Sequence, residues 1–336
     1  MRAAILGVGF MGWIHSLAYQ RSSAANLVAF CSRDASKRAG DWRGIQGNFG
    51  PPGEQIDVSG MNVYDDLATM LRDPSIELVD ICLPPHMHPA AIRQCLDAGK
   101  YVLCEKPLCL DAAQSRELAE SARGRLMVAH ILPFLPEYRY VCESASSGRL
   151  GAVTGGRFKR VIGPPTWIPD FYDEQTVGGP LVDLHVHDAH LIRMLFGMPS
   201  SVSVSRRRHD GDPSATPQYV DSLFHFDDPS LVVGAVSGVI NQPSRGFTHG
   251  FDIQFEHANV QFEMAAFGDG TVATIPLVVA HADGTVERPE LPVADAIGPF
   301  VDELDAAAAV VAGGPMPPAL DAITAADAIE ICIMQR

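Results

Sequence analysis

The first 130 residues alternate short, continuously apolar runs with helical patterns, and this alternation constrains the fold more than any other feature. The runs are rich in Val, Ile and Leu, which is typical of strands buried on both faces of a parallel sheet. We therefore predict a doubly wound α/β domain. The predicted strands are residues 3–6, 27–31, 78–83, 101–104 and 126–129, and the predicted helices are residues 11–21, 64–71, 89–98 and 111–122.

Three glycines between the first predicted strand and helix have the spacing G-x-G-x-x-G. In such a loop the first glycine allows the tight turn, the second lets a pyrophosphate approach the backbone, and the third lets the helix pack closely on the strand. The N–H groups at the start of the helix then face the phosphates. The sequence therefore predicts a dinucleotide site that contains Gly7, Gly9, Phe10, Met11 and Gly12.

The end of the second predicted strand bears on the choice of cofactor. Ser32 stands twenty residues after Gly12, where an NAD site usually has Asp or Glu for the ribose. Arg33 and Lys37 suit a 2′-phosphate instead, since arginine grips phosphate through its forked donors. We predict NADP as the cofactor. NAD stays open, because Asp34 would meet the ribose if the register shifted.

After residue 130 the pattern changes to polar–apolar alternation, which is typical of half-buried antiparallel strands. We predict an α/β Rossmann domain over residues 1–128 and an α+β domain over 129–336 with an open, mostly antiparallel sheet and helices on one face. Residues 41–60 are rich in Gly and Pro and are predicted to be an inserted surface loop, against the adenosine end or a second subunit. The second domain has predicted strands at 153–162, 219–226 and 231–240, an antiparallel pair of strands within 250–264, and helices near 305–312 and 319–334.

Two later segments carry candidate catalytic groups. Lys106 lies in Glu105-Lys106-Pro107 at the carboxyl end of a predicted strand, the edge at which open α/β sheets bind ligands. Asp183 and His187 are four residues apart, and we expect them on one face of one helix. A carboxylate beside an imidazole can orient it, and histidine is well matched to proton transfer near neutral pH.

The order of these motifs resembles that of the glucose–fructose oxidoreductase / inositol dehydrogenase (Gfo/Idh/MocA) family, over essentially the whole chain. The motifs are the glycine loop, Pro84-Pro85-His86-Met87-His88, Glu105-Lys106-Pro107, and Gly178-Gly179 followed by Asp183-x-x-x-His187. The resemblance implies a Rossmann domain, an α+β domain whose sheet is often used in oligomerisation, and an active site between the domains. The implied activity is NAD(P)-dependent oxidation or reduction of a hydroxyl or carbonyl of a sugar, cyclitol or related polyol.

The resemblance also implies residue roles. Lys106, Asp183 and His187 match the family's catalytic trio: His187 takes the hydroxyl proton, Lys106 holds and polarises the oxygen, and Asp183 orients the site. Further candidate residues are Pro84, His86, His88, Glu105 and again Lys106 for the cofactor, and Trp167, Asp170, Tyr172 and His190 for the substrate; Trp167, Asp170 and Tyr172 could equally be core or dimer contacts.

The chain departs from the family pattern at three positions. Pro180 replaces a third glycine, His190 stands where an acidic residue is often found, and His185 stands where glycine is frequent. The catalytic trio is intact, so these departures bear on the identity of the substrate more than on the type of reaction.

Composition excludes several classes of partner. The net charge of −15 and the pI of about 5.1 argue against nucleic acid, which requires a basic surface. No apolar run reaches the ~18 residues of a membrane helix. The seven cysteines are scattered and form no C-x-x-C, which favours a reduced, cytoplasmic chain over disulfides or a zinc site. We expect a small polyhydroxy substrate and a homodimer or homotetramer formed through the second sheet.

Three other functions remain open. The H-x-H of His185 and His187 could suggest a metal-dependent hydrolase, but residues two apart on a helix point to different sides, so we expect no metal site. A glycoside hydrolase or lyase that uses NAD without net redox change would need the same residues. A catalytically silent nucleotide-binding regulator would keep the fold alone, and the intact trio argues against it.

Overall fold

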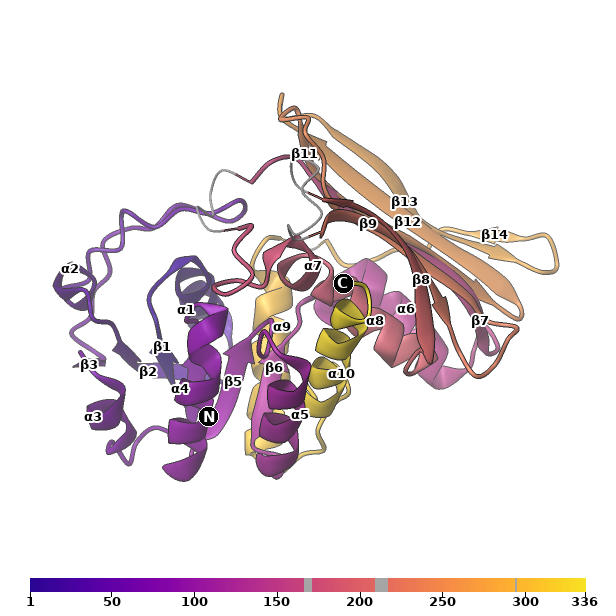
Figure 1. The fold of residues 1–336 in the computed structure, drawn as a ribbon. Coiled ribbons are helices and arrows are strands. Elements are labelled where there is room, and N and C mark those ends of the chain that lie inside the picture. Colours follow the sequence, from indigo (N-terminus) through magenta and orange to yellow (C-terminus); the bar gives the residue numbers. More distant parts are fainter. Residues whose placement is uncertain (166–170, 209–216, 294) are drawn as a thin grey trace. The chain divides into compact units, whose positions relative to one another are not determined.

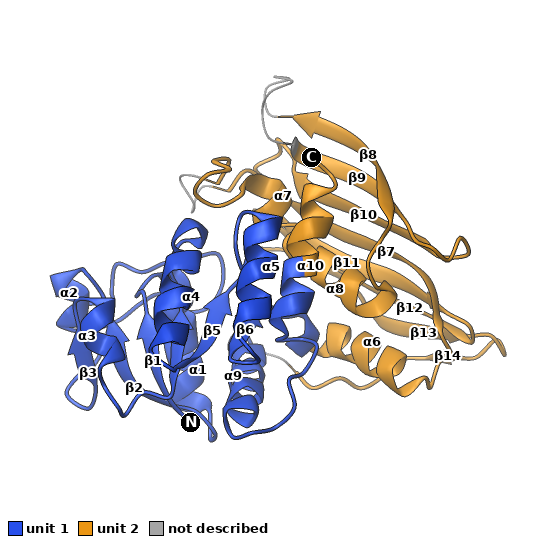
Figure 2. Cartoon of the chain, turned by 60° about the horizontal axis from the view of Figure 1, so that its bottom comes forward, with its two compact units in different colours: residues 1–134, 294–326 blue, residues 135–293, 327–336 orange. Residues whose placement is uncertain are grey.

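The computed structural model describes residues 1–165, 171–208, 217–293 and 295–336. The chain divides into a first unit, residues 1–134 with 294–326, and a second unit, residues 135–293 with 327–336 (Figure 2). This division differs from the single cut predicted after residue 128. Residues 294–326 return to the first unit because helix α9 (Gly298–Val311) packs on α1 (Phe10–Arg21) and places Phe300 and Leu304 in its core.

The first unit is built on a six-stranded parallel sheet in the order β3-β2-β1-β4-β5-β6, with helices packed against it (Figure 1). This is the predicted doubly wound fold. The strands are β1 (Arg2–Leu6), β2 (Asn26–Cys31), β3 (Asn62–Tyr64), β4 (Leu78–Ile81), β5 (Tyr101–Glu105) and β6 (Leu126–Ala129), and the other helices are α2 (Ala35–Arg38), α3 (Leu67–Leu71), η1 (Pro85–Met87), α4 (His88–Asp97), α5 (Ala112–Ser121) and η2 (Leu132–Phe134).

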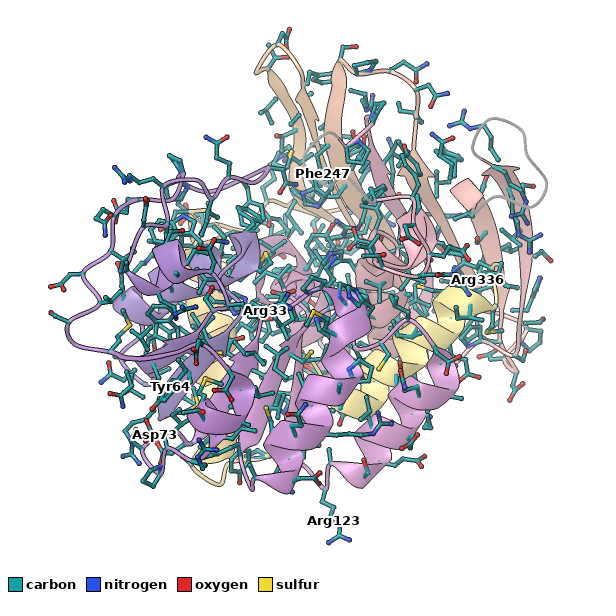
Figure 3. The ribbon with its side chains drawn as sticks, turned by 60° about the vertical axis from the view of Figure 1, so that its left-hand side comes forward. Arg33, Tyr64, Asp73, Arg123, Phe247 and Arg336 are labelled. Atoms are coloured by element: carbon teal, nitrogen blue, oxygen red, sulfur yellow. The ribbon has the colours of Figure 1, made fainter. Side chains whose placement is uncertain are left out.

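The helix predicted over residues 64–71 is wrong at its start. Asn62–Tyr64 pairs with β2 as the edge strand β3, and α3 begins only at Leu67. The Asp66 carboxylate accepts the Thr69 N–H at 2.9 Å, a side-chain N-cap that fixes this start. The Tyr64 hydroxyl donates to Asp73 at 2.8 Å and ties β3 to the loop after α3 (Figure 3).

Residues 41–60 are more than a surface loop, because Trp42 enters the core of the first unit and Phe49, although 36% exposed, packs on α9. Trp42 is buried, with its ring edge-on to Trp13 at 6.0 Å and to Phe30 at 5.4 Å between centroids. Phe49 stacks on Phe300 of α9 at 5.8 Å. Edge-on and stacked aromatic pairs add stability beyond the area that they bury, so the insertion is anchored to both α1 and α9.

The second unit is an eight-stranded sheet in the order β14-β13-β12-β11-β7-β10-β9-β8, antiparallel except for the β7–β10 pair. The predicted alternation holds in β11, where Phe251, Ile253 and Phe255 are buried and Gln254 is exposed. The strands are β7 (Val153–Ile162), β8 (Ser201–Arg208), β9 (Pro217–His225), β10 (Val232–Val239), β11 (Arg245–Phe255), β12 (Ala258–Phe267), β13 (Val272–His281) and β14 (Val286–Glu287).

Helices cover one face of this sheet. Tyr138 of α6 (Pro136–Ser147) packs edge-on against Phe251 and Phe262 at 5.0 and 6.2 Å. The short α7 (Gly179–Asp183) contacts β9 and β10, and α8 (Val186–Phe196) contacts β7. The last helix is α10 (Ala322–Ile333). Among the described residues, no helix is long and apolar enough to cross a membrane.

Candidate active site

The three glycines of the predicted dinucleotide loop differ in what surrounds them. Gly7 has φ +99°, and a Cβ there would lie 2.9 Å from the Cys82 carbonyl oxygen. A Cβ on Gly12 would lie 2.3 Å from the Gly7 carbonyl oxygen, so this glycine permits close packing of α1 on the loop. Gly9 is the N-cap of α1 and has extended backbone, and a Cβ there would have no described atom within 4 Å. The fold therefore requires glycine at 7 and 12, whereas the space at Gly9 is open to a ligand.

The residues after β2 form a turn that is tied to the glycine loop. Lys37 Nζ donates to the Val8 carbonyl at 2.6 Å, and Arg38, which the sequence analysis missed, donates to the Ser32 and Arg33 carbonyls at 2.8 Å each. The Asp34 carboxylate caps α2 through the Ser36 N–H at 2.8 Å. Arg33 is exposed, so its guanidinium is open to a phosphate.

The Pro84–His88 segment divides into an exposed and a buried part. Pro84 and His86 are exposed around η1. His88 is fully buried, with Nδ1 2.9 Å from the Pro107 carbonyl and Nε2 2.8 Å from the Leu83 carbonyl, and burial lowers its pKa. The ring of His88 thus connects the two loops that follow β4 and β5, a supporting role in place of the direct cofactor contact expected from the resemblance.

Glu105 and Lys106 lie at the carboxyl end of β5, as predicted. Glu105 is buried, and its Oε2 accepts the backbone N–H of Lys106 at 3.1 Å. Lys106 itself is half-buried. The strand end therefore fixes the backbone from which the lysine side chain extends.

Asp183 and His187 do not share one helix, and this part of the prediction is wrong. Asp183 is the last residue of α7, and His187 lies in the first turn of α8. The helix is interrupted because the Pro180 carbonyl accepts the N–H groups of both Leu184, at 3.2 Å, and His185, at 3.4 Å. Asp183 and His187 are both half-buried.

Two other histidines of this segment are packing groups. His185 and His190 are fully buried, and burial lowers the pKa of His185 to about 4 and that of His190 to about 3. Both rings are therefore neutral near pH 7. His185 lies parallel to the ring of Phe224, with 6.3 Å between centroids.

Only part of the predicted substrate wall can be placed. Tyr172 is half-buried and meets Phe171 edge-on at 5.5 Å. Trp167 and Asp170 lie outside the described residues.

A buried ion pair that the sequence analysis missed supports α8. Arg160 of β7 donates to both oxygens of Asp188, at 3.0 and 2.9 Å, and the two side chains are only 3% and 1% exposed. The signal was present in the sequence: Arg160 interrupts the apolar face of a strand, and Asp188 directly follows His187. The pair fixes the helix turn that carries His187 to the sheet.

The fold and the glycine loop define a Rossmann-type dinucleotide-binding protein with an α+β second domain. Residues 1–131 match the family model "Oxidoreductase family, NAD-binding Rossmann fold", and residues 138–261 match "GFO/IDH/MocA C-terminal domain". The chain belongs to the Gfo/Idh/MocA family.

Three relatives illustrate the similarity. Trans-1,2-dihydrobenzene-1,2-diol dehydrogenase of Macaca fascicularis is 36% identical over 154 residues, a match that covers 44% of each chain. Inositol 2-dehydrogenase of Rhizobium meliloti is 27% identical over 86% of this chain and 81% of its own. The solved structure of a levoglucosan dehydrogenase with NADH and L-sorbose superposes with a TM-score of 0.76 at 20% identity, covering 99% of this chain and 95% of that one, which shows a shared fold.

Proposed function

We propose that the protein is an NAD(P)-dependent dehydrogenase or reductase that acts on a CH–OH group of a sugar, cyclitol or related polyol. The observation that carries the proposal is the open space at Gly9, which lies at the start of an uninterrupted helix. The fold requires glycine on either side of this position, at Gly7 and Gly12. The relatives described above are dehydrogenases of a dihydrobenzene diol, of inositol and of levoglucosan, which supports this substrate class.

The residues present fit a nicotinamide dinucleotide. Gly7, Gly9, Phe10, Met11 and Gly12 would hold its pyrophosphate, because backbone N–H groups at a helix N-terminus favour anions. When bound, the cofactor supplies the hydride acceptor or donor.

The chain itself then handles the proton and the substrate oxygen. His187 accepts the proton of the substrate hydroxyl, a step for which imidazole is suited near neutral pH. Lys106 donates to the same oxygen and stabilises the charge that develops there. Asp183 orients the site.

NADP is the proposed cofactor. Asp34, the acidic residue nearest to the predicted ribose position, and Arg33 are both exposed in the same turn, but the Asp34 carboxylate is engaged in capping α2. Arginine binds a phosphate monoester through two parallel donors. Pro84 and His86 are proposed to line the cofactor site as well, and Tyr172 the substrate site, whereas Glu105 and His190 are buried and are proposed to support the two sites.

A turnover screen tests the proposed function. The protein is incubated with NADP⁺ or NAD⁺ and a panel of cyclitols, glycosides and anhydrosugars, and both reduced nicotinamide and product are quantified. We expect one reduced nicotinamide for each carbonyl formed, at a lower cofactor KM for NADP⁺ than for NAD⁺. Product without net cofactor reduction would instead reveal a redox-neutral hydrolase or lyase, and binding without turnover on any polyol would indicate a regulator.

We also propose that the protein acts in the cytoplasm as a homodimer or homotetramer formed through the second sheet. All seven cysteines are free thiols, which suits a reducing compartment. Light scattering coupled to size-exclusion chromatography measures the assembly.

A further inference from the structure

A chain of ionisable groups crosses the core of the first unit, beneath the strand ends that carry the proposed site. Asp80, in the middle of the apolar strand β4, and His15 of α1 are both fully buried, and Glu105 is 7% exposed. His15 Nδ1 lies 2.8 Å from Asp80 Oδ2, and His15 Nε2 lies 3.0 Å from Glu105 Oε1. Buried charges are costly unless they are paired, so this arrangement calls for an explanation beyond packing.

The two contacts of His15 differ in kind. The Asp80 contact is a hydrogen bond, which the Tyr19 hydroxyl supports by donating to the same oxygen at 3.1 Å. The Glu105 contact is short but is not aligned as a hydrogen bond, so we describe it as an ion-pair contact. Burial alone would lower the pKa of His15, but the interactions with Asp80 and Cys82 together more than offset this and raise it well above its ordinary value. His15 is therefore an imidazolium near pH 7.

The chain continues from Glu105 to the proposed catalytic lysine. Glu105 Oε1 contacts His15, while Oε2 of the same carboxylate accepts the backbone N–H of Lys106 at 3.1 Å. The orientation of this carboxylate therefore depends on the imidazolium on one side and sets the lysine backbone on the other.

We propose that His15 is a positioning residue that acts through Glu105: by bridging Asp80 and Glu105 it fixes the end of β5 and thereby the place from which Lys106 reaches the substrate oxygen. The inference rests on the proposed function for the role of Lys106, but the bridge itself is defined within the first unit. The proposal gives a role to Asp80 and His15, which belong neither to the glycine loop nor to the catalytic trio.

The other groups that face His15 do not supply a competing charge. Cys82 Sγ lies 3.7 Å from His15 Nδ1, and burial raises the pKa of this thiol, which stays neutral. Glu303 of α9 is 1% exposed, neither of its oxygens has a hydrogen-bond partner among the described residues, and burial raises its pKa well above the ordinary value. Burial also raises the pKa of Tyr19, so the contacts that define the bridge are those of His15 with the carboxyl groups of Asp80 and Glu105.

A metal ion is the alternative occupant of this cluster. One donor atom each from His15, Asp80 and Cys82 lies within 4.8 Å of the others. An imidazolium has no lone pair for a metal, and ligation would require both its deprotonation and that of the thiol. The direct hydrogen bond between His15 and Asp80 therefore favours the bridge over a cation.

Two matched variants test the proposal. The side-chain nitrogen of asparagine reaches the position of Nδ1 and that of glutamine the position of Nε2, so His15→Asn keeps the Asp80 contact and His15→Gln keeps the Glu105 contact. Both variants lose the positive charge. We expect kcat to fall at least tenfold further in His15→Asn, which loses the Glu105 contact, than in His15→Gln, which keeps it. The reason is that misplacement of a catalytic group by about 1 Å can cost about 10²-fold. The Kd for reduced nicotinamide should stay within about threefold of the wild-type value in both variants, because only the geometry of the reacting groups changes.

Equal losses of kcat in the two variants, in step with equal drops in Tm, would overturn the proposal and leave His15 a purely structural residue. Nitrogen-15 spectra of the wild-type protein give a second readout that is independent of turnover. The imidazole signal that disappears in His15→Gln is that of His15, and at pH 8 it should show both ring nitrogens protonated. A signal with one unprotonated nitrogen would contradict the bridge. So would a His15 signal that changes when zinc alone is added. A protein with the imidazolium signal but no turnover on any polyol would overturn the proposed function and leave the bridge intact.

Discussion

Replacement of Lys106 by alanine is expected to lower kcat by about three orders of magnitude, while the Kd for reduced nicotinamide changes little. The lysine extends from a backbone that Glu105 fixes, and its ammonium group is proposed to stabilise charge on the substrate oxygen, an interaction that is strongest in the transition state. The dinucleotide is held mainly by the glycine loop, which the substitution does not touch. Steady-state kinetics on the best substrate of the panel, with fluorescence titration of the cofactor, measures both quantities.

A matched lysine provides the control. Lys159 of β7 is paired with Glu263 at 2.8 Å with both side chains more than a third exposed, and Lys159→Ala should leave kcat within about twofold because exposed ion pairs contribute little. Turnover of Lys106→Ala within tenfold of wild type would remove Lys106 from the chemistry. A large loss of cofactor affinity instead would assign it to nucleotide binding.

Replacement of Asp188 by asparagine is expected to destabilise the second unit by about 3–5 kcal/mol, because it leaves the buried Arg160 guanidinium without a counter-charge. The pair is bidentate and almost wholly buried, so little solvent screens the loss. Urea denaturation followed by circular dichroism, read at the transition of the second unit, measures the change. Since His187 precedes Asp188, kcat should fall as well, even where the variant is still folded.

Lys159, the residue before Arg160, again provides the control variant. Lys159→Met removes an exposed ion pair one position before Arg160 on the same strand and should cost less than about 1 kcal/mol. The double variant Arg160→Met/Asp188→Leu should recover much of the stability, because it removes both buried charges together. A loss below about 1 kcal/mol in Asp188→Asn would mean that the pair is solvated in solution and does not fix α8.

The parts of the fold that the sequence predicts are those with local causes. Strands buried on both faces appear in the sequence as unbroken apolar runs. The three glycines mark a turn in which position 7 requires glycine. The alternation in β11 likewise follows from one buried and one polar face. Such patterns do not depend on which distant segment packs against them.

The parts that escaped prediction depend on distant partners. Nothing local to residues 298–311 shows that this helix returns to the first unit, where it packs on α1. The break between Asp183 and His187 arises from a carbonyl shared by two N–H groups, although their spacing alone fits one helix. A signal was available for Asp80, a lone charge in a buried strand, but its partner His15 lies 65 residues earlier in the chain.

The central claim, that the loop around Gly9 holds a nicotinamide dinucleotide, is tested most directly by titrating wild-type protein and Gly9→Val with NADPH and NADH. The backbone of Gly9 is extended (φ −102°, ψ −159°) and no described atom lies near its Cβ position, so valine should leave Tm unchanged. It should nevertheless weaken binding at least tenfold, because the side chain occupies the space that the pyrophosphate needs. Gly12→Ala, whose Cβ would meet the Gly7 carbonyl, should lower Tm instead. Wild-type protein that binds neither nucleotide, or a Gly9→Val variant that binds as tightly as wild type, would contradict the account.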